Sequence, residues 1–262
     1  DDIAWIFNLR GRDVDYNPVF YAYALIGLES AILFIAPEKV PENVKTTLLE
    51  LGVALQPYAA LEVALSNLDG NVLIDPSTVS ISIQNAFGKD CKLMHGASPS
   101  TVMKARKDGI ELGHIRNAME KDGVALLRLV RWMDSEIRSG NLTEHAVGER
   151  LAAYRAEQEG YFGESFPAIA GYEGNGAIVH YRPAAVGSAT LQQRGVFLLD
   201  SGGQYLDGTT DITRTFALGD IPEGAAKAYT LVLKGHIAVA KAKFPVGTVG
   251  YQLDPLARMF LW

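Results

Sequence analysis

Three aspartates lie within one short segment, LLDSGGQYLDGTTDITRTF, which covers residues 198–216. Asp200 follows a continuous apolar run of the kind that forms a buried strand. Asp211 lies in TDITRTF, whose alternation of polar and apolar residues is typical of a strand with one buried face. Asp207 precedes Gly208 between these two strands, and Asp-Gly is a common hairpin turn. We therefore assign Asp207 to the turn, and Asp200 and Asp211 become the candidates for chemistry.

The spacing of these two acids decides whether they can act together. A simple two-residue turn would set Gln204 across from Asp211. Asp200 would then lie four residues farther along the same face, about 13 Å away, which is too far to share an ion. A bulge or bend in the segment 201–203, Ser-Gly-Gly, would shorten this distance, because paired glycines are typical of bulges. The two acids can therefore meet only if the glycines deform the strand.

If the two acids do meet on one buried face, their negative charges repel each other. Either one carboxyl is protonated at a raised pKa, or a cation neutralises both. The threonine-rich surroundings supply hydroxyl groups, and the nearby Arg214 is directed to the other face by the strand alternation. A divalent metal site at Asp200 and Asp211 is therefore the preferred interpretation.

Two other motifs overlap this segment. LLDSGG matches the apolar-apolar-Asp-Ser-Gly signature of aspartic proteases, which need two such loops sharing one proton. The chain has no second Asp-Ser/Thr-Gly, so this interpretation requires a dimer. LDGTT is similar to the Asp-x-Asp-Gly-Thr motif of haloacid-dehalogenase phosphatases, but Tyr205 stands where the first Asp is needed. Both matches are short.

The first hundred residues contain elements of an α/β domain. The apolar segments AWIFNLRG, FYAYALIG, SAILFIA and NVLIDP, bounded by Gly, Pro or Asn, predict strands. Residues 41–51 and 58–68 lie between these strands, and their apolar residues recur at the spacing of a helix. We assign residues 1–104 to this domain.

From residue 105 onward the pattern changes to an α+β domain, residues 105–262. Asp108 and Glu111 form a capping box at the start of a long helix. Its predicted buried face comprises Leu112, Ile115, Met119, Leu126, Val130 and Met133. Further helices are predicted from Thr143 to before Gly160 and from Pro222 to before Pro245, with strands at AIVHYRP, GVFLLDSGG and TTDITRTFALG between them. His236 in the last helix is interpreted as a packed or capping residue.

Composition excludes several classes of function. A net charge of −6 without a basic run argues against a nucleic-acid partner. The longest apolar stretch, YAYALIGLESAILFIAP, is interrupted by Glu29 and predicts two strands instead of a membrane span. Cys91 is the single cysteine, so an intrachain disulfide is impossible and a cytoplasmic location is expected, with Cys91 packed as a small apolar residue. Neither end carries a start or stop signal, and we expect both to be cut from a longer protein.

The aspartate segment, preceded by AIVHYRP and followed by YTLVLKGHIAVAKAKFPVGT, resembles the Xaa-Pro aminopeptidases (aminopeptidase P). These are pita-bread, dinuclear metallopeptidases. DIAWIFNLRG and NPVFYAYALI extend the resemblance to the start of the chain. It implies an α/β middle domain followed by the first half of a pita-bread (creatinase/aminopeptidase) catalytic domain, with the chain truncated before the rest.

The resemblance also implies the site and the activity. Asp200 and Asp211 match the two aspartate ligands of two divalent metal ions per subunit, Mn²⁺ in many members, and Asp211 bridges them. His180 in IVHY matches a substrate-contacting histidine. The remaining histidine and two glutamate ligands follow a segment that lies beyond Trp262, so the chain alone is expected to be inactive and no catalytic residue is assigned within it. The implied reaction is hydrolysis of the N-terminal Xaa-Pro bond of peptides with proline at the second position, by a homodimeric cytoplasmic enzyme.

Two alternatives remain open. Some pita-bread domains are binding modules without metals, and others are prolidase-like or creatinase-like hydrolases. Retention of Asp200 and Asp211 favours an enzyme, because a binding module has no need for adjacent buried acids. The segments YLDGTTDITRT and KGHIAV favour aminopeptidase P over the other hydrolases.

Overall fold

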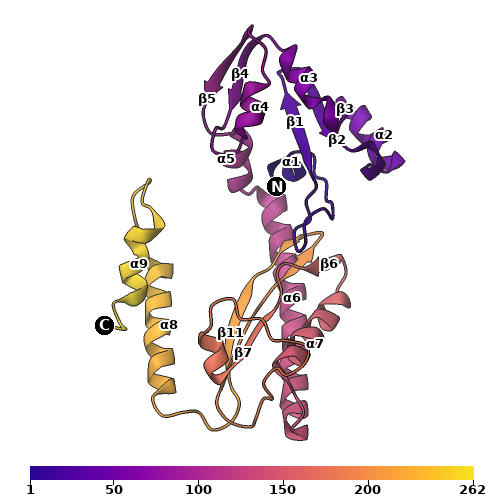
Figure 1. Ribbon diagram of the computed structural model, residues 1–262. Coiled ribbons are helices and arrows are strands. Elements are labelled where there is room, and N and C mark those ends of the chain that lie inside the picture. Colours follow the sequence, from indigo (N-terminus) through magenta and orange to yellow (C-terminus); the bar gives the residue numbers. More distant parts are fainter. The chain divides into compact units, whose positions relative to one another are not determined.

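The computed structural model describes residues 1–262, which form two compact units. The first unit contains residues 1–118 together with 206–208, and the second contains residues 119–205 and 209–262. The long helix α6 (Gly109–Glu136) therefore begins in the first unit and continues in the second. Figure 1 shows the helices and strands in their order along the chain. None of the helices is both long and apolar enough to cross a lipid bilayer.

A three-stranded sheet of order β1-β2-β3 lies at the centre of the first unit, with β1 antiparallel and β3 parallel to β2. Strand β2 is buried on both faces, because Leu33 and Ile35 pack into one core cluster and Phe34 packs into another. Strands β4 and β5 form a separate parallel pair. The elements are α1 (Asp2–Ile6), β1 (Ala22–Ile26), β2 (Ala31–Ile35), α2 (Glu42–Glu50), β3 (Val53–Pro57), α3 (Leu61–Ser66), β4 (Gly70–Ile74), α4 (Ile81–Asn85), β5 (Cys91–His95) and α5 (Pro99–Ala105). The predicted α/β class is confirmed.

The first residues form a helix, α1, where the sequence predicted a strand at AWIFNLRG. Ile3 and Phe7 lie one helical turn apart and both pack on the core beside β2. Trp5 Nε1 also donates a hydrogen bond to Glu111 Oε1 at 2.9 Å. The strand prediction was wrong because a short apolar run fits either element, and here long-range contacts select the helix.

The second unit has α+β architecture, as predicted. Two three-stranded sheets, of order β11-β8-β7 and β10-β9-β6, are the strand elements. Leu129 of α6, Leu151 of α7 and Phe197 of β8 are fully buried in one common core, and Figure 1 shows α6 and α7 beside strands β7 and β11. The further elements are α7 (Glu144–Ala156), β6 (Tyr161–Glu164), β7 (Ile169–Tyr172), β8 (Val196–Ser201), β9 (Gly203–Tyr205), β10 (Gly208–Thr209), β11 (Ile212–Ala217), α8 (Ala225–Lys241) and α9 (Gly250–Arg258).

The predicted helix starts are confirmed at α6 and α7. Asp108 Oδ1 accepts hydrogen bonds from the backbone of Ile110 and Glu111 at 2.8 Å, and Glu111 Oε2 accepts from the Asp108 backbone at 2.9 Å. This reciprocal pair is the capping box that the sequence indicated. Thr143 caps α7 through its hydroxyl oxygen, which accepts from the backbone of Ala146 at 3.2 Å. Helix α8 begins three residues after the predicted Pro222.

The buried face of α6 is offset from the predicted one. Of the predicted residues only Met133 is buried, whereas Leu112 and Met119 remain 41% and 40% exposed. The stripe that is actually buried contains Ala118, Asp122, Ala125, Leu129 and Met133. Two alanines and an aspartate occupy this stripe. A prediction based on large apolar residues therefore selects the neighbouring face of the helix. The offset matters because it brings Asp122, a charged residue, into the core.

Candidate metal centre

The hairpin that carries the three aspartates turns one residue earlier than predicted. Leu206 and Asp207 form the turn, and Gly208 already belongs to β10. Asp207 Oδ2 accepts a hydrogen bond from Asn117 Nδ2 at 2.9 Å. Asp207 is therefore a turn residue, as expected, and it also anchors the turn through a tertiary contact that the sequence did not reveal.

The register of the hairpin brings Asp200 and Asp211 together. Asp200 of β8 pairs with Thr213 of β11, so Asp211 lies two residues before that partner, on the same face of the sheet. A diagonal neighbour of this kind is within reach of a side-chain interaction. The gap of about 13 Å that a hairpin turning at Asp207-Gly208 would leave is therefore absent.

The pairing keeps one register on both sides of Gly202, because Thr210 bonds to Gly203 and Ile212 pairs with Ser201. Gly202 itself interrupts the extended strand between β8 and β9, and its carbonyl oxygen accepts a hydrogen bond from the Ser165 backbone at 3.0 Å. A Cβ atom on Gly202 would lie 2.0 Å from the Thr210 carbonyl oxygen and 2.2 Å from Ser165 Oγ. Only glycine fits such a close backbone approach. The glycines interrupt the strand as expected, but the earlier turn, and not a bulge at the glycines, sets the register that brings the two acids together.

The two carboxyl groups differ in exposure and interact with each other. Asp200 is half-buried, and its Oδ1 atom is enclosed without a hydrogen-bond partner, whereas Asp211 is exposed. The pKa of the Asp211 carboxyl is raised above its usual value by partial desolvation, then by the negative charge of Asp200 and by a hydrogen bond with it. Closely spaced carboxylates with an orphaned oxygen are suited to a hard divalent cation, which prefers oxygen ligands. The two residues thus fit the metal that the sequence predicted.

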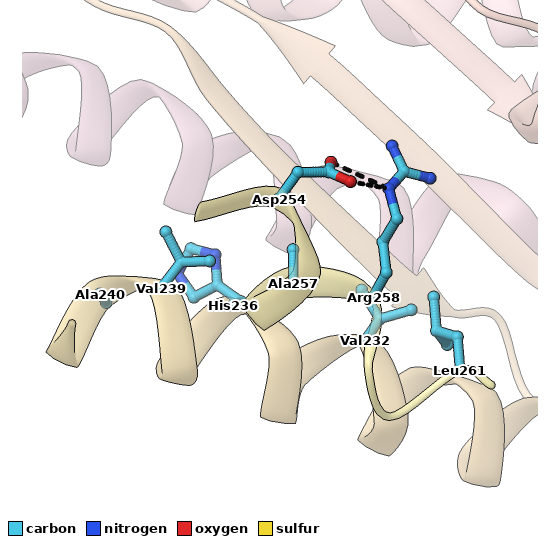
Figure 2. A pocket seen from close by; sticks show the side chains of 8 residues that line it. All are labelled: Val232, His236, Val239, Ala240, Asp254, Ala257, Arg258 and Leu261. Atoms are coloured by element: carbon cyan, nitrogen blue, oxygen red, sulfur yellow. Dashed lines mark hydrogen bonds and ion pairs between the residues drawn. The ribbon is translucent and has the colours of Figure 1, made fainter. Parts of the chain in front are cut away.

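The remaining ligands of a metal centre are not found in this chain. No group of three His, Cys, Asp or Glu side chains in residues 1–262 could hold a metal ion. His236 is exposed and lines a mostly apolar hollow of about 620 Å³ between α8 and α9, next to the Asp254–Arg258 ion pair (Figure 2). It lies inside α8, away from both helix ends, so it is not a capping residue. Cys91 is a free thiol at the start of β5.

His180 lies in a different setting from the predicted one. The segment AIVHYRP forms no strand; a short 3₁₀ helix (Glu173–Ala177) is followed by a turn that contains His180. His180 is exposed and has a φ angle of +55°, in the left-handed region. The strand prediction was wrong because the long connection from β7 to β8 is organised by tertiary contacts instead of by a ladder. Exposure of the imidazole is compatible with a contact to substrate.

A buried ion pair next to the metal strand escaped the sequence prediction. Arg155 of α7 and Asp122 of α6 are both fully buried and form a bidentate pair, with Nε to Oδ1 at 2.6 Å and Nη2 to Oδ2 at 3.0 Å. Arg155 Nη2 also donates to Ser201 Oγ at 3.1 Å, and the Tyr205 hydroxyl donates to Asp122 Oδ1 at 3.0 Å. These bonds link two helices to both strands that flank Gly202. The sequence signal that could have revealed this pair was Asp122 itself, an acid within a helical stripe of small residues.

Two protein-family descriptions match the chain. Residues 1–111 match the creatinase/prolidase N-terminal domain, and residues 113–262 match metallopeptidase family M24. Curated relatives align with the whole chain. They include a probable Xaa-Pro aminopeptidase P from Laccaria bicolor, 38% identical over 270 residues, and aminopeptidase P2 from Arabidopsis thaliana, 36% identical over 294 residues. The chain spans 42% and 41% of these two proteins, less than half of their length.

Solved structures have the same fold. The X-prolyl aminopeptidase from Caenorhabditis elegans, described as a cytosolic enzyme with a dinuclear active site, superposes with a TM-score of 0.91 at 34% sequence identity. The match covers all of this chain and 44% of that one. The prolidase from Pyrococcus furiosus has a TM-score of 0.70 at 19% identity, covering 98% of this chain and 72% of that one, which indicates a shared fold.

Proposed function

We propose that this chain, which belongs to metallopeptidase family M24 and has the pita-bread fold, is part of an Xaa-Pro aminopeptidase. The enzyme would hydrolyse the first peptide bond of peptides that carry proline at the second position. Similarity to proteins named Xaa-Pro aminopeptidase P along the entire chain supports this substrate class. The observation that carries the proposal is the pair Asp200 and Asp211, brought together on one sheet face with an orphaned carboxylate oxygen.

Asp200 and Asp211 would hold two divalent metal ions, for which we propose Mn²⁺. Bound metal in such a site polarises the scissile carbonyl as a Lewis acid and lowers the pKa of water. Asp200 is held rigidly by the β8 ladder, with neighbours in β7 and β11. Asp211 lies just before β11, where the chain leaves the regular ladder. His180 would donate a hydrogen bond to the substrate from its exposed turn.

Two carboxylates are too few donors to hold two divalent ions tightly. We therefore propose that the residues described here are inactive on their own and that the full-length protein supplies further ligands. We also propose that the protein is a cytoplasmic homodimer. Residues 1–104 would form its creatinase-like middle domain, and residues 105–262 would form the first half of its catalytic domain.

The test is hydrolysis by the full-length protein of matched peptides with proline or alanine at the second position, before and after treatment with a chelator. We expect cleavage of the proline peptide alone, lost with the metal and restored by Mn²⁺. Cleavage of Xaa-Pro dipeptides but not of longer peptides would favour a prolidase-like enzyme. Peptide binding without cleavage, unaffected by the chelator, would favour a metal-free binding module. Inhibition by pepstatin but not by the chelator would favour the aspartic-protease interpretation.

A further inference from the structure

The connection from β7 to β8 holds His180 in an unusual backbone conformation. The Tyr181 backbone donates to the Ile178 carbonyl at 3.2 Å, which closes a four-residue turn with His180 at its third position. A positive φ at that position, +55° here, is normally left to glycine or asparagine. A side chain in this conformation persists only where surrounding contacts impose it, and such residues cluster at functional sites.

The contacts that impose this conformation converge on Glu144, in the first turn of α7. Its carboxylate is fully buried and accepts four hydrogen bonds, one from the last residue of β7 and three from the connection that follows. Oε1 accepts from the Tyr172 backbone at 2.7 Å and from Asn175 Nδ2 at 2.9 Å. Oε2 accepts from the Tyr181 hydroxyl at 2.9 Å and from the Ala189 backbone at 3.1 Å. Two donors precede His180 in the chain and two follow it, so one carboxylate ties both halves of the connection.

Tyr181 completes this arrangement from the position next to His180. Its hydroxyl donates to Glu144 and also accepts from Asn175 Nδ2 at 3.1 Å. The Asn175 carbonyl in turn accepts from the Ile178 backbone at 3.1 Å. The turn that presents His180 is therefore anchored at both ends. The four donors satisfy both buried oxygens of the Glu144 carboxylate.

We infer that Glu144 and Tyr181 are positioning residues, which hold the His180 turn in place so that the imidazole reaches the substrate without reordering the loop. This inference rests on the proposed function, because it assigns a purpose to His180 in the peptidase. Neither residue touches the reacting atoms itself. A loop that is already ordered avoids the entropy loss of fixing the histidine when substrate binds.

The experiment compares Tyr181→Phe with Tyr172→Phe in the full-length protein. We call the four hydrogen bonds accepted by Glu144 the clamp. Both changes delete one hydroxyl, but the Tyr172 hydroxyl donates to the Arg194 carbonyl, outside the clamp. Tyr181→Phe is preferred to Glu144→Gln, because a change to a fully buried carboxylate can prevent folding. We expect Tyr181→Phe to keep its bound metal and to lose about tenfold in kcat/KM, the scale of one hydrogen bond. Amide hydrogen exchange in residues 175–181 should become about tenfold faster, and Tyr172→Phe should change neither quantity there.

A double-mutant cycle with His180→Ala identifies the route of the effect. If Tyr181 acts through His180, Tyr181→Phe costs nothing further in the His180→Ala background. An equal loss in both backgrounds, or kinetics and exchange like those of Tyr172→Phe, overturns the inference. A wild-type protein that does not cleave Xaa-Pro peptides overturns the proposed function instead. In that case faster exchange in Tyr181→Phe still supports the clamp, and unchanged exchange rejects it.

Discussion

The guanidinium of Arg155 donates a hydrogen bond at 3.1 Å to the hydroxyl of Ser201, the residue that directly follows Asp200 along β8. The same guanidinium is paired with Asp122, and all three side chains are fully buried. The end of β8, which carries the candidate ligand Asp200, is therefore held in place by an ion pair between two helices.

Breaking this pair should destabilise the protein strongly. Asp122→Asn leaves the buried Arg155 charge without its partner, which costs about 3–5 kcal/mol. The matched control is Glu157→Gln, because Glu157 pairs with Arg128 at the surface and such pairs contribute about 0–1 kcal/mol. Urea denaturation of the full-length variants measures both. Equal losses in the two variants would show that the buried pair has no special role in stability.

Metal binding should depend on Asp211 and not on Asp207. Asp211→Asn removes one of the two adjacent carboxylates and should abolish stoichiometric metal and Xaa-Pro cleavage. Asp207→Asn changes the charge of the turn residue, and Asn retains an oxygen that can accept from Asn117, so metal content should stay unchanged. Elemental analysis after dialysis measures the metal. If the two variants lost metal equally, Asp207 would belong to the site.

The raised pKa of Asp211 predicts a pH-dependent cost in the metal-free protein. A carboxyl whose folded pKa lies above its unfolded value binds protons more tightly when folded, so stability falls as pH rises from the unfolded pKa to the raised one. Metal-free Asp211→Asn should therefore be more stable than wild type at pH 7 and equal to it near pH 3. Urea denaturation in a chelator at both pH values tests this. A destabilised variant at pH 7 would contradict the repulsion between Asp200 and Asp211.

The ion pair of Asp2 with Lys104 should stabilise the first unit at all but very low pH. The hydrogen bond from Lys104 is the main cause that lowers the pKa of Asp2 to about 2. Stability from a lowered carboxyl pKa is present above the unfolded value and is lost as pH falls through about 2. Asp2→Asn should cost about 1 kcal/mol at pH 7, after allowance for solvent screening. Asp1→Asn is the control, because Asp1 also contacts Lys104 but is 79% exposed; an equal cost would point to a diffuse charge effect.

His180→Ala separates a substrate contact from a metal ligand. We expect the full-length variant to keep its metal while kcat/KM falls by about 10²-fold, the scale of losing one oxyanion donor. His180→Gly should behave similarly and should also relieve the left-handed strain at φ +55°. Elemental analysis and steady-state kinetics decide between the roles. Loss of metal would identify His180 as a ligand, and unchanged kinetics would make it a residue of the loop alone.

Local sequence was sufficient for the features that depend on neighbouring residues. The apolar run before Asp200 and the alternation around Asp211 indicated two strands, and β8 and β11 confirm them. The capping box at Asp108 and the cap at Thr143 located two helix starts within a residue. Each of these signals acts over a few residues, through backbone hydrogen bonds that the nearby side chains make or leave open.

Only the tertiary structure decided the geometry of the site. The hairpin register depends on a turn at Leu206 and Asp207, one residue earlier than the local Asp-Gly signal predicted, where Asp207 accepts a hydrogen bond from the distant Asn117. Asp122 could not be assigned to the core from its helix alone, because its burial requires Arg155, which lies 33 residues away. The left-handed His180 likewise lies beside Tyr181, whose hydroxyl bonds to Glu144 of a helix that precedes it in the chain. Buried charges and strained turns are stabilised by partners distant in sequence, and local patterns carry no record of those partners.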